Sequence, residues 1–240
     1  MAAPARVPTV MVMAVAIITG ASRGLGYALA RGLATAGWDL VVDGRDPVAL
    51  AEAAQRLGAT AVPGDVTDPA HRAELVAAAD RLGGADLVVN NAGILGPSPQ
   101  PALAEYPLDV LRDVVEVNLV APLALTQLLL PGLRRRNGTV VNITSDAAVE
   151  PYEGWGGYGS AKAALEQASR ILAAEEPSVR VWWVDPGDMR TRMHQEAFPD
   201  EDISDRPEPE TVVPAFLHLL DDRPASGRIR LADVLAGAGA

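Results

Sequence analysis

The 240-residue sequence predicts an α/β fold organised around a parallel β-sheet. Short apolar runs alternate with longer amphipathic segments, which is the pattern of successive βαβ units. A glycine-rich motif follows the first apolar run, and no internal repeat or linker divides the chain, so we expect a single domain over residues 1–240. With 49% hydrophobic and 21% charged residues, the composition is that of a soluble globular protein with a substantial core.

The apolar run that ends at Ile18 is predicted to form the first strand, over Val12–Ile18. Residues 10–18 are too few to cross a bilayer, and a signal peptide would need more positive charge before them than Arg6 supplies. Cleavage after this run would also destroy the glycine-rich motif. We therefore expect a cytoplasmic protein with a disordered tail over residues 1–9, and we regard Met13 as an alternative start codon.

The other elements follow from apolar periodicity and from residues that mark helix ends. Strands are expected over Trp38–Val42, Thr60–Pro63, Asp86–Val89, Thr139–Ile143, Val179–Val184 and Arg228–Leu231. Helices are expected over Leu25–Ala36, Pro47–Leu57, Pro69–Leu82, Leu108–Leu119, Pro122–Arg135, Gly157–Ala174 and Thr211–Leu220. Gly37 ends the first helix, and Asp46 and Asp68 are predicted to cap the second and third. Residues 190–210, rich in Asp, Glu and Pro, are expected to form a mobile lid loop over the substrate.

Charge and composition exclude several classes of function. The chain has 20 basic and 31 acidic residues, a formal charge of −11, which argues against a broad nucleic-acid or anionic-membrane surface. A phosphorylated cofactor stays possible, because a helix N-terminus or a few cations bind it. The chain has no cysteine, and His71, His194 and His218 have no metal-ligand spacing, so we expect no disulfide, thiolate or metal site.

The glycine-rich motif has the residues that a dinucleotide pyrophosphate needs. It runs Thr19-Gly20-Ala21-Ser22-Arg23-Gly24-Leu25-Gly26, between the first predicted strand and the first predicted helix. Gly20, Gly24 and Gly26 would let the backbone turn tightly and approach the pyrophosphate at the helix N-terminus. The alternative is a glycine-rich turn that binds no ligand.

The end of the second strand favours NADP(H) over NAD(H). A carboxylate at this point grips a ribose diol, whereas a 2′-phosphate needs cations. Arg45, together with Arg23 and the hydroxyl of Ser22, favours the phosphate. Asp43 argues against this preference, because a shift of one residue along the strand would place its carboxylate on the ribose. Gly44 fits the position of a ribose-binding acid better than Asp43 does. We therefore expect NADP(H), with NAD(H) as the alternative.

Tyr158 and Lys162 lie four residues apart in a segment rich in good helix formers, so they share one face of a helix. A free phenol has a pKa of about 10 and exchanges protons poorly at neutral pH. A neighbouring ammonium favours the phenolate, and we therefore expect Lys162 to lower the pKa of Tyr158. The alternative for the pair alone is a surface tyrosine and a solvated lysine.

Six motifs together resemble the short-chain dehydrogenase/reductase family. They are the octet at Thr19, Asn90-Asn91-Ala92-Gly93, Asn118, Ser145, Tyr158 with Lys162, and Pro186-Gly187. They occur in the family's order and spacing. The resemblance implies a Rossmann-type three-layer sandwich with a central seven-stranded parallel sheet, a nicotinamide cofactor across the carboxyl ends of the strands, and a homodimer or homotetramer. The C-terminal run from Arg228 to Asp233 lacks the glycine-rich ending of tetrameric members, which leaves tetramer formation open.

The resemblance also implies roles for individual residues. Tyr158 would be the acid/base, Lys162 would lower its pKa and hold the nicotinamide ribose, and Ser145 would hydrogen-bond the reacting oxygen. Asn118 would support a water relay behind Lys162. Ser145 could instead cap local backbone, and Asn118 could satisfy a break between helices. The implied cofactor contacts are Gly20, Ser22, Arg23, Gly24, Leu25, Gly26, Arg45, Asp65, Val66, Asn91, Ala92, Gly93, Tyr158, Lys162, Pro186, Gly187 and Thr191.

The expected function is NADP(H)-dependent interconversion of a carbonyl and an alcohol. Tyr152, Trp155, Met193 and Phe198 would form an apolar pocket, with Ser145 and Tyr158 at the reacting oxygen, so the predicted substrate is small to medium, uncharged and mostly apolar. A non-catalytic NADP(H)-binding sensor is the alternative, although such proteins typically lose the tyrosine or the lysine. An epimerase or dehydratase of the same fold would need a larger C-terminal substrate domain than this chain has.

Overall fold

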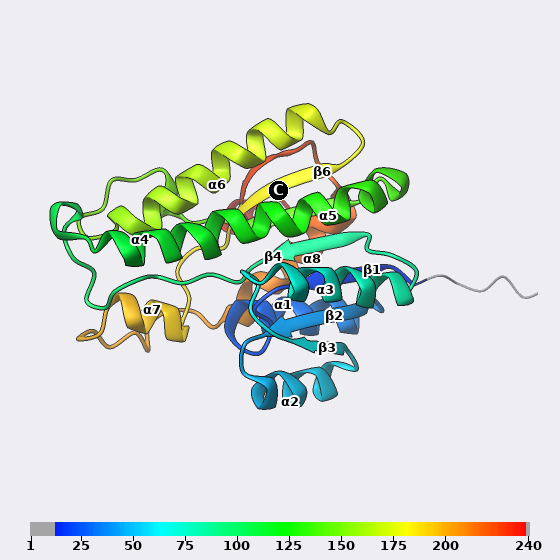
Figure 1. The fold of residues 1–240 in the computed structure, drawn as a ribbon, viewed down its shortest axis with the longest axis horizontal. Helices are drawn as coiled ribbons and strands as arrows, with labels where there is room; N and C mark the ends of the chain where they lie inside the picture. Colours follow the sequence, from blue (N-terminus) through cyan, green and yellow to red (C-terminus); the bar gives the residue numbers. More distant parts are fainter. Residues whose placement is uncertain (1–12, 239–240) are drawn as a thin grey trace, which may run out of the picture.

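Seven strands form one parallel sheet in the computed structural model, which describes residues 13–238 (Figure 1). They are β1 (Val15–Ile18), β2 (Asp39–Gly44), β3 (Thr60–Pro63), β4 (Leu87–Asn90), β5 (Thr139–Ile143), β6 (Arg180–Asp185) and β7 (Gly227–Arg230). Their order across the sheet is β3-β2-β1-β4-β5-β6-β7, and every neighbouring pair is parallel. The predicted seven-stranded Rossmann-type sheet is confirmed. The predicted tail over residues 1–9 lies outside the described residues.

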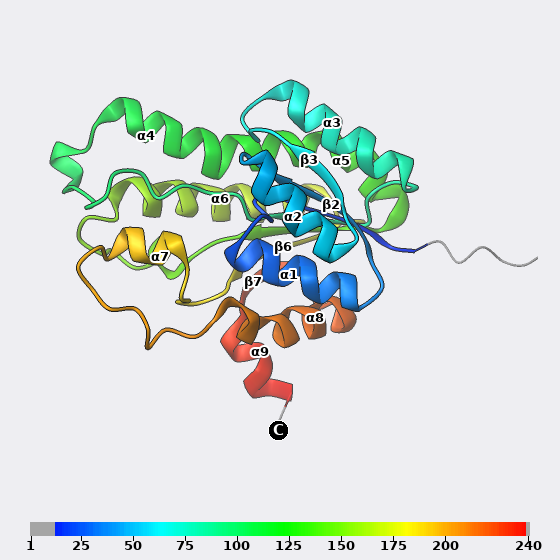
Figure 2. The same cartoon turned by 90° about the horizontal axis from the view of Figure 1, so that it is seen from below.

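Helices cover both faces of the sheet, which makes three layers (Figure 2). One face carries α1 (Gly24–Thr35), α2 (Pro47–Leu57) and α8 (Val213–Asp222). The other carries α3 (Pro69–Arg81), α5 (Ala121–Arg136) and α6 (Gly156–Glu175). Ala16 and Ile18 of β1 pack into the first layer, whereas Val15 and Ile17 pack into the second. Strands buried on both faces must be apolar throughout, which explains the continuous apolar runs in the sequence.

Local signals placed several helix starts correctly. The side chain of Asp46 accepts hydrogen bonds from the backbone of Val48 and Ala49, and Asp68 accepts one from Ala70. Both caps satisfy N–H groups that have no partner inside the helix. The predicted first and last residues of α2, β3 and β5 match those of the structure.

The predicted break near residue 120 is wrong. A helix runs without interruption from α4 (Leu108–Val115) through a π-helical turn (Glu116–Val120) into α5. Pro122 cannot donate a helical hydrogen bond, and the wider π turn just before it accommodates this loss within the helix. By length and composition this helix could cross a membrane, but in the fold Leu125, Leu129 and Leu133 are buried against the sheet, as in a core helix.

The structure also contains helices that the sequence reading missed. The predicted lid loop contains α7 (Arg192–Ala197), and α9 (Leu231–Ala238) follows the last strand. Short helical turns lie at Leu103–Glu105, Asp146–Ala148 and Pro209–Val212. The hydroxyl of Thr191 accepts a hydrogen bond from the backbone of His194 and caps α7. Figure 2 shows α7 beyond the carboxyl ends of the strands, where a lid would lie.

Candidate active site

A large cleft of about 1630 Å³ opens at the carboxyl ends of the strands. Parallel strands end at the same edge of the sheet, so residues that follow different strands meet there. Every predicted site residue lines this cleft except Asn118. Asn118 is buried behind Gly93, and a methyl group on Gly93 would lie 2.7 Å from its side-chain oxygen.

The loop between β1 and α1 has the shape that a pyrophosphate needs. Gly20 and Gly24 have φ values of +66° and +56°, a left-handed conformation that favours glycine. A methyl group on Gly26 would lie 2.5 Å from the carbonyl oxygen of Gly20, so the loop closes on the helix only with glycine there. The side chain of Arg23 does not cap α1, which leaves the first N–H groups of this helix to bind an anion.

Asp43 holds this loop in place from the end of β2. Its Oδ1 accepts a hydrogen bond from the backbone N–H of Gly20 at 2.6 Å, and its Oδ2 lies 3.1 Å from Nε2 of His71. Asp43 and His71 are both buried. Sequence reasoning missed this role, because it depends on a partner 28 residues away on α3. Both oxygens of this buried carboxylate therefore serve to hold the loop and α3 together.

The position after Asp43 is Gly44, which lies against Ser22. A methyl group on Gly44 would lie 3.3 Å from the Ser22 hydroxyl oxygen. Arg23 and Arg45 line the same end of the cleft, and both are exposed. This end of the cleft therefore presents two cations and a hydroxyl.

Tyr158 and Lys162 lie near the N-terminus of α6 and line the cleft, as the helical spacing predicted. Tyr158 is 8% exposed and Lys162 is 3% exposed. The Lys162 ammonium lies 5.5 Å from the centre of the Tyr158 ring and donates a hydrogen bond of 2.8 Å to the carbonyl oxygen of Ile143. Lys162 is the only lysine in the sequence, a signal that the sequence reading did not use.

Behind them, Asn118 donates hydrogen bonds to the carbonyl oxygens of Ile94 and Val114, at 2.8 and 2.9 Å. Its own oxygen is buried and has no hydrogen-bond partner among the described residues. A buried acceptor without a partner usually binds water, which fits the predicted relay.

Ser145 follows β5 and belongs to a hydrogen-bond network that was not predicted. Its hydroxyl donates to Oδ1 of Asp146 at 2.9 Å, and the Tyr152 hydroxyl donates to Oδ2 of the same carboxylate at 3.0 Å. Ser145 can therefore donate to a substrate oxygen only when its hydroxyl turns away from Asp146. The sequence predicted Tyr152 as part of an apolar pocket. Its hydroxyl is instead hydrogen-bonded to Asp146, so Tyr152 adds a polar group to the pocket.

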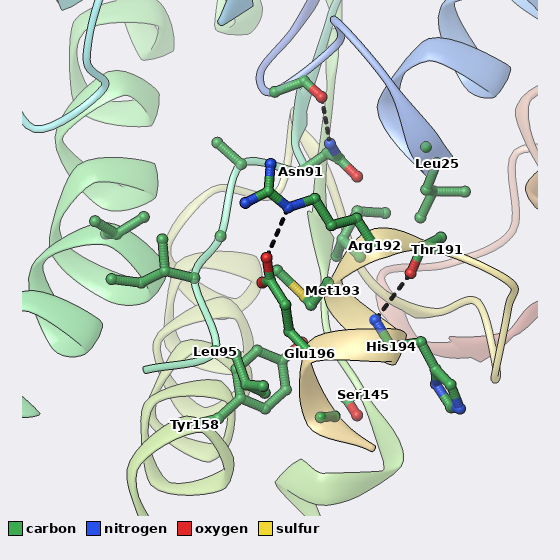
Figure 3. A pocket seen from close by; sticks show the side chains of 18 of the residues that line it. Leu25, Asn91, Leu95, Ser145, Tyr158, Thr191, Arg192, Met193, His194 and Glu196 are labelled. Carbon is green, nitrogen blue, oxygen red and sulfur yellow. Dashed lines mark hydrogen bonds and ion pairs between the residues drawn. The ribbon is translucent and has the colours of Figure 1, made fainter. Parts of the chain in front are cut away.

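Tyr158 belongs to an apolar cluster in the cleft. Leu95, Tyr158 and Ala147 pack together, with Trp155 and Met193 against them. Figure 3 shows Leu95 beside the Tyr158 ring, and Met193 packs against the same cluster. The Trp155 ring centre lies 5.8 Å from that of Tyr158. Leu95 was missed because it lies just beyond the Asn-Asn-Ala-Gly motif and carries no chemical group of its own.

Comparison with known proteins identifies the family. The family model for short chain dehydrogenases matches residues 14–202. The chain belongs to the short-chain dehydrogenase family. This short-chain dehydrogenase is therefore an oxidoreductase that interconverts CH–OH and C=O groups with a nicotinamide dinucleotide.

Relatives of this short-chain dehydrogenase act on different substrates. It is 38% identical over 179 residues to the serine 3-dehydrogenase of Agrobacterium fabrum, covering 71% of this chain and 70% of that protein. It is 36% identical over 200 residues to the sepiapterin reductase of Bos taurus, covering 75% and 74%. Among solved structures, an alcohol dehydrogenase of Thermococcus sibiricus complexed with 5-hydroxy-NADP has a TM-score of 0.80 and 29% identity, covering 91% of this chain and 95% of that one.

The pKa of Tyr158 in this short-chain dehydrogenase depends on burial and on nearby carboxylates. Burial raises the pKa of Tyr158 above its usual value, and the negative charges of Asp146 and Asp185 raise it further. The Lys162 ammonium lies 5.5 Å from the centre of the Tyr158 ring, and burial lowers its own pKa to about 8. That Lys162 lowers the pKa of Tyr158 stays a prediction, and the burial and carboxylates around the phenol act in the opposite direction.

Proposed function

We propose that this short-chain dehydrogenase is an NADP(H)-dependent carbonyl reductase. The engagement of Asp43 by Gly20 and His71 carries the NADP(H) assignment, because a ribose diol would have to compete with these two partners for the carboxylate. Arg23 and Arg45 then supply positive charge for a 2′-phosphate. The similar archaeal structure complexed with 5-hydroxy-NADP supports this choice.

The residues in the cleft divide the chemistry among them. When bound, the nicotinamide supplies or accepts a hydride. Tyr158 donates its hydroxyl proton to the carbonyl oxygen, and Ser145 hydrogen-bonds the same oxygen once it turns from Asp146. Lys162 would hold the nicotinamide ribose. The side-chain oxygen of Asn118, which has no partner among the described residues, would bind a water through which Tyr158 regains its proton.

Carbonyl reduction is the direction that uses Tyr158 in its protonated state. Reduction needs the protonated phenol, which burial and two carboxylates stabilise through the neutral range. Oxidation needs the phenolate, which the same surroundings disfavour. Reduction therefore needs no change in the protonation of Tyr158 at neutral pH, whereas oxidation does.

The proposed substrate is uncharged and mostly apolar. Leu95, Trp155 and Met193 provide an apolar wall beside Tyr158. A carboxylate on the substrate would be repelled by Asp146, which lines the cleft next to Ser145. A neutral ketone or aldehyde with an aromatic or branched apolar group fits both features.

The test is a panel of carbonyl compounds assayed with NADPH and with NADH. We expect NADPH oxidation with neutral aryl and alkyl ketones, and slower oxidation with matched ketones that carry a carboxylate. Binding of NADPH, followed by its fluorescence, without turnover of any neutral carbonyl would contradict this proposal and support the sensor alternative. Faster turnover with NADH than with NADPH would overturn the cofactor assignment.

Replacing Asp146 with asparagine should shift the pH dependence of alcohol oxidation. The Asp146 charge raises the pKa of Tyr158, so the Asp146→Asn variant should have a lower Tyr158 pKa. Oxidation, which needs the phenolate, should then begin to rise at lower pH than in the wild type. Values of kcat for alcohol oxidation, measured between pH 6 and pH 10 at saturating NADP⁺, check this expectation.

The control for this variant is Glu150→Gln, which removes an exposed carboxylate that raises the pKa of Tyr152 but is no cause of the shift at Tyr158. Its pH profile should match the wild type. An unchanged profile in Asp146→Asn would show that Asp146 does not act on Tyr158.

A further inference from the structure

Arg228, on the last strand, joins three segments of the active site with one guanidinium group. Its Nε donates to Oε1 of Glu166 at 2.9 Å. Its Nη2 donates to Oδ2 of Asp185 at 3.0 Å and to the backbone carbonyl oxygen of Ser145 at 3.2 Å. We infer that Arg228 is a positioning residue, which holds Ser145 and the Pro186-Gly187 turn in register with the helix that carries Tyr158 and Lys162.

The first link runs through Glu166, one turn after Lys162 on α6. The Glu166 carboxylate is 2% exposed, and its Oε1 also accepts a hydrogen bond from the Thr144 hydroxyl at 2.9 Å. Thr144 directly precedes Ser145. Glu166 and Arg228 therefore tie the catalytic helix to both residues that follow β5.

The second link runs through Asp185, the last residue of β6. The Asp185 carboxylate is 6% exposed, and its Oδ1 accepts a hydrogen bond from the backbone N–H of Gly187 at 3.0 Å. Gly187 has a φ of +78°, so this turn has a conformation that few other residues adopt. Arg228 thus holds the carboxylate that shapes the turn which lines the cleft.

Arginine is suited to this position for geometric reasons. Its side chain is 21% exposed, and its planar fork donates in fixed directions to three acceptors at once. A lysine at the same place would keep the positive charge beside the two carboxylates but could not reproduce the fork. The Arg228→Lys variant therefore separates positioning from charge neutralisation.

The kinetic part of this inference rests on the proposed function. Hydrogen exchange tests the positioning role of Arg228 without any turnover. In Arg228→Lys we expect a kcat for carbonyl reduction about tenfold below the wild type, with KM for the carbonyl within about threefold, because a small misplacement of reacting groups lowers the chemical step. We also expect faster amide exchange in residues 144–147 and 186–191, which follow β5 and β6. Exchange in the strands themselves should keep its wild-type rate.

The matched control is Arg170→Gln, because the half-exposed side chain of Arg170 donates to Oε2 of the same Glu166. Its kcat and its exchange in both segments should match the wild type. If Arg228→Lys unfolds, the double variant Arg228→Gln/Glu166→Gln replaces it, because this variant leaves fewer buried charges. We expect the same lower kcat and the same faster amide exchange in this variant.

Two results would overturn the inference. The first is wild-type exchange in residues 144–147 and 186–191 of a folded Arg228 variant. The second is faster exchange spread evenly over the whole chain, which would show a general loss of stability. If the wild type reduces no carbonyl, the proposed function fails, and the exchange data alone decide on Arg228.

Discussion

The Tyr158→Phe variant should lose carbonyl reduction by about a thousandfold in kcat, while NADPH binds within about threefold of the wild-type affinity. Loss of a general acid typically costs between about a hundredfold and ten-thousandfold. The phenylalanine ring keeps the contacts of Tyr158 with Leu95 and Trp155, so the fold and the cleft should be preserved. Single-turnover rates with a neutral ketone and a fluorescence titration with NADPH measure the two effects separately.

Tyr106→Phe is the control for the removal of a phenol hydroxyl. Tyr106 is also buried, does not line the cleft, and its hydroxyl has no hydrogen-bond partner among the described residues. Its kcat should equal that of the wild type. If Tyr158→Phe turned over at the wild-type rate, Tyr158 would not be the proton donor and the proposed mechanism would fail.

The double variant Arg23→Ala/Arg45→Ala should weaken NADPH binding by about a hundredfold and NADH binding very little. Hydrogen bonds from a charged donor contribute about 1.5–3 kcal/mol each, and two exposed arginines should act at the lower end of that range. NADH lacks the 2′-phosphate and so does not depend on these charges. Dissociation constants for both dinucleotides, measured by fluorescence titration, test the difference.

Salt and a surface arginine provide the controls for this double variant. In the wild type the preference for NADPH should decrease between 0.05 and 0.5 M salt, because the cations at this end of the cleft are exposed to solvent. Arg31→Ala, on the outer side of α1 and paired with Glu210, should bind NADPH normally. Equal losses for NADPH and NADH in the double variant would show that the arginines bind the shared part of the dinucleotide.

The sequence alone predicted elements whose limits are set by neighbouring residues. Asp46 and Asp68 mark helix starts because their carboxylates bind backbone N–H groups two or three residues away. The sequence-based prediction failed at Pro122. Proline normally ends a helix, but the π turn before Pro122 lets the long helix continue. The prediction also missed α7, whose cap at Thr191 lies in an acidic, proline-rich stretch that is typical of a loop.

The sequence also determined which residues meet in the cleft, because the ends of parallel strands meet at one edge of the sheet. Only the tertiary structure decided what several of these residues do there. Asp43 holds the glycine-rich loop, and Arg228 holds Ser145 and Asp185, through partners remote in the chain. The pKa of Tyr158 depends on burial and on Asp185, neither of which residue spacing reveals. Spacing along one helix fixes which side chains are neighbours, whereas desolvation and long-range charge arise only once the whole chain has packed around them.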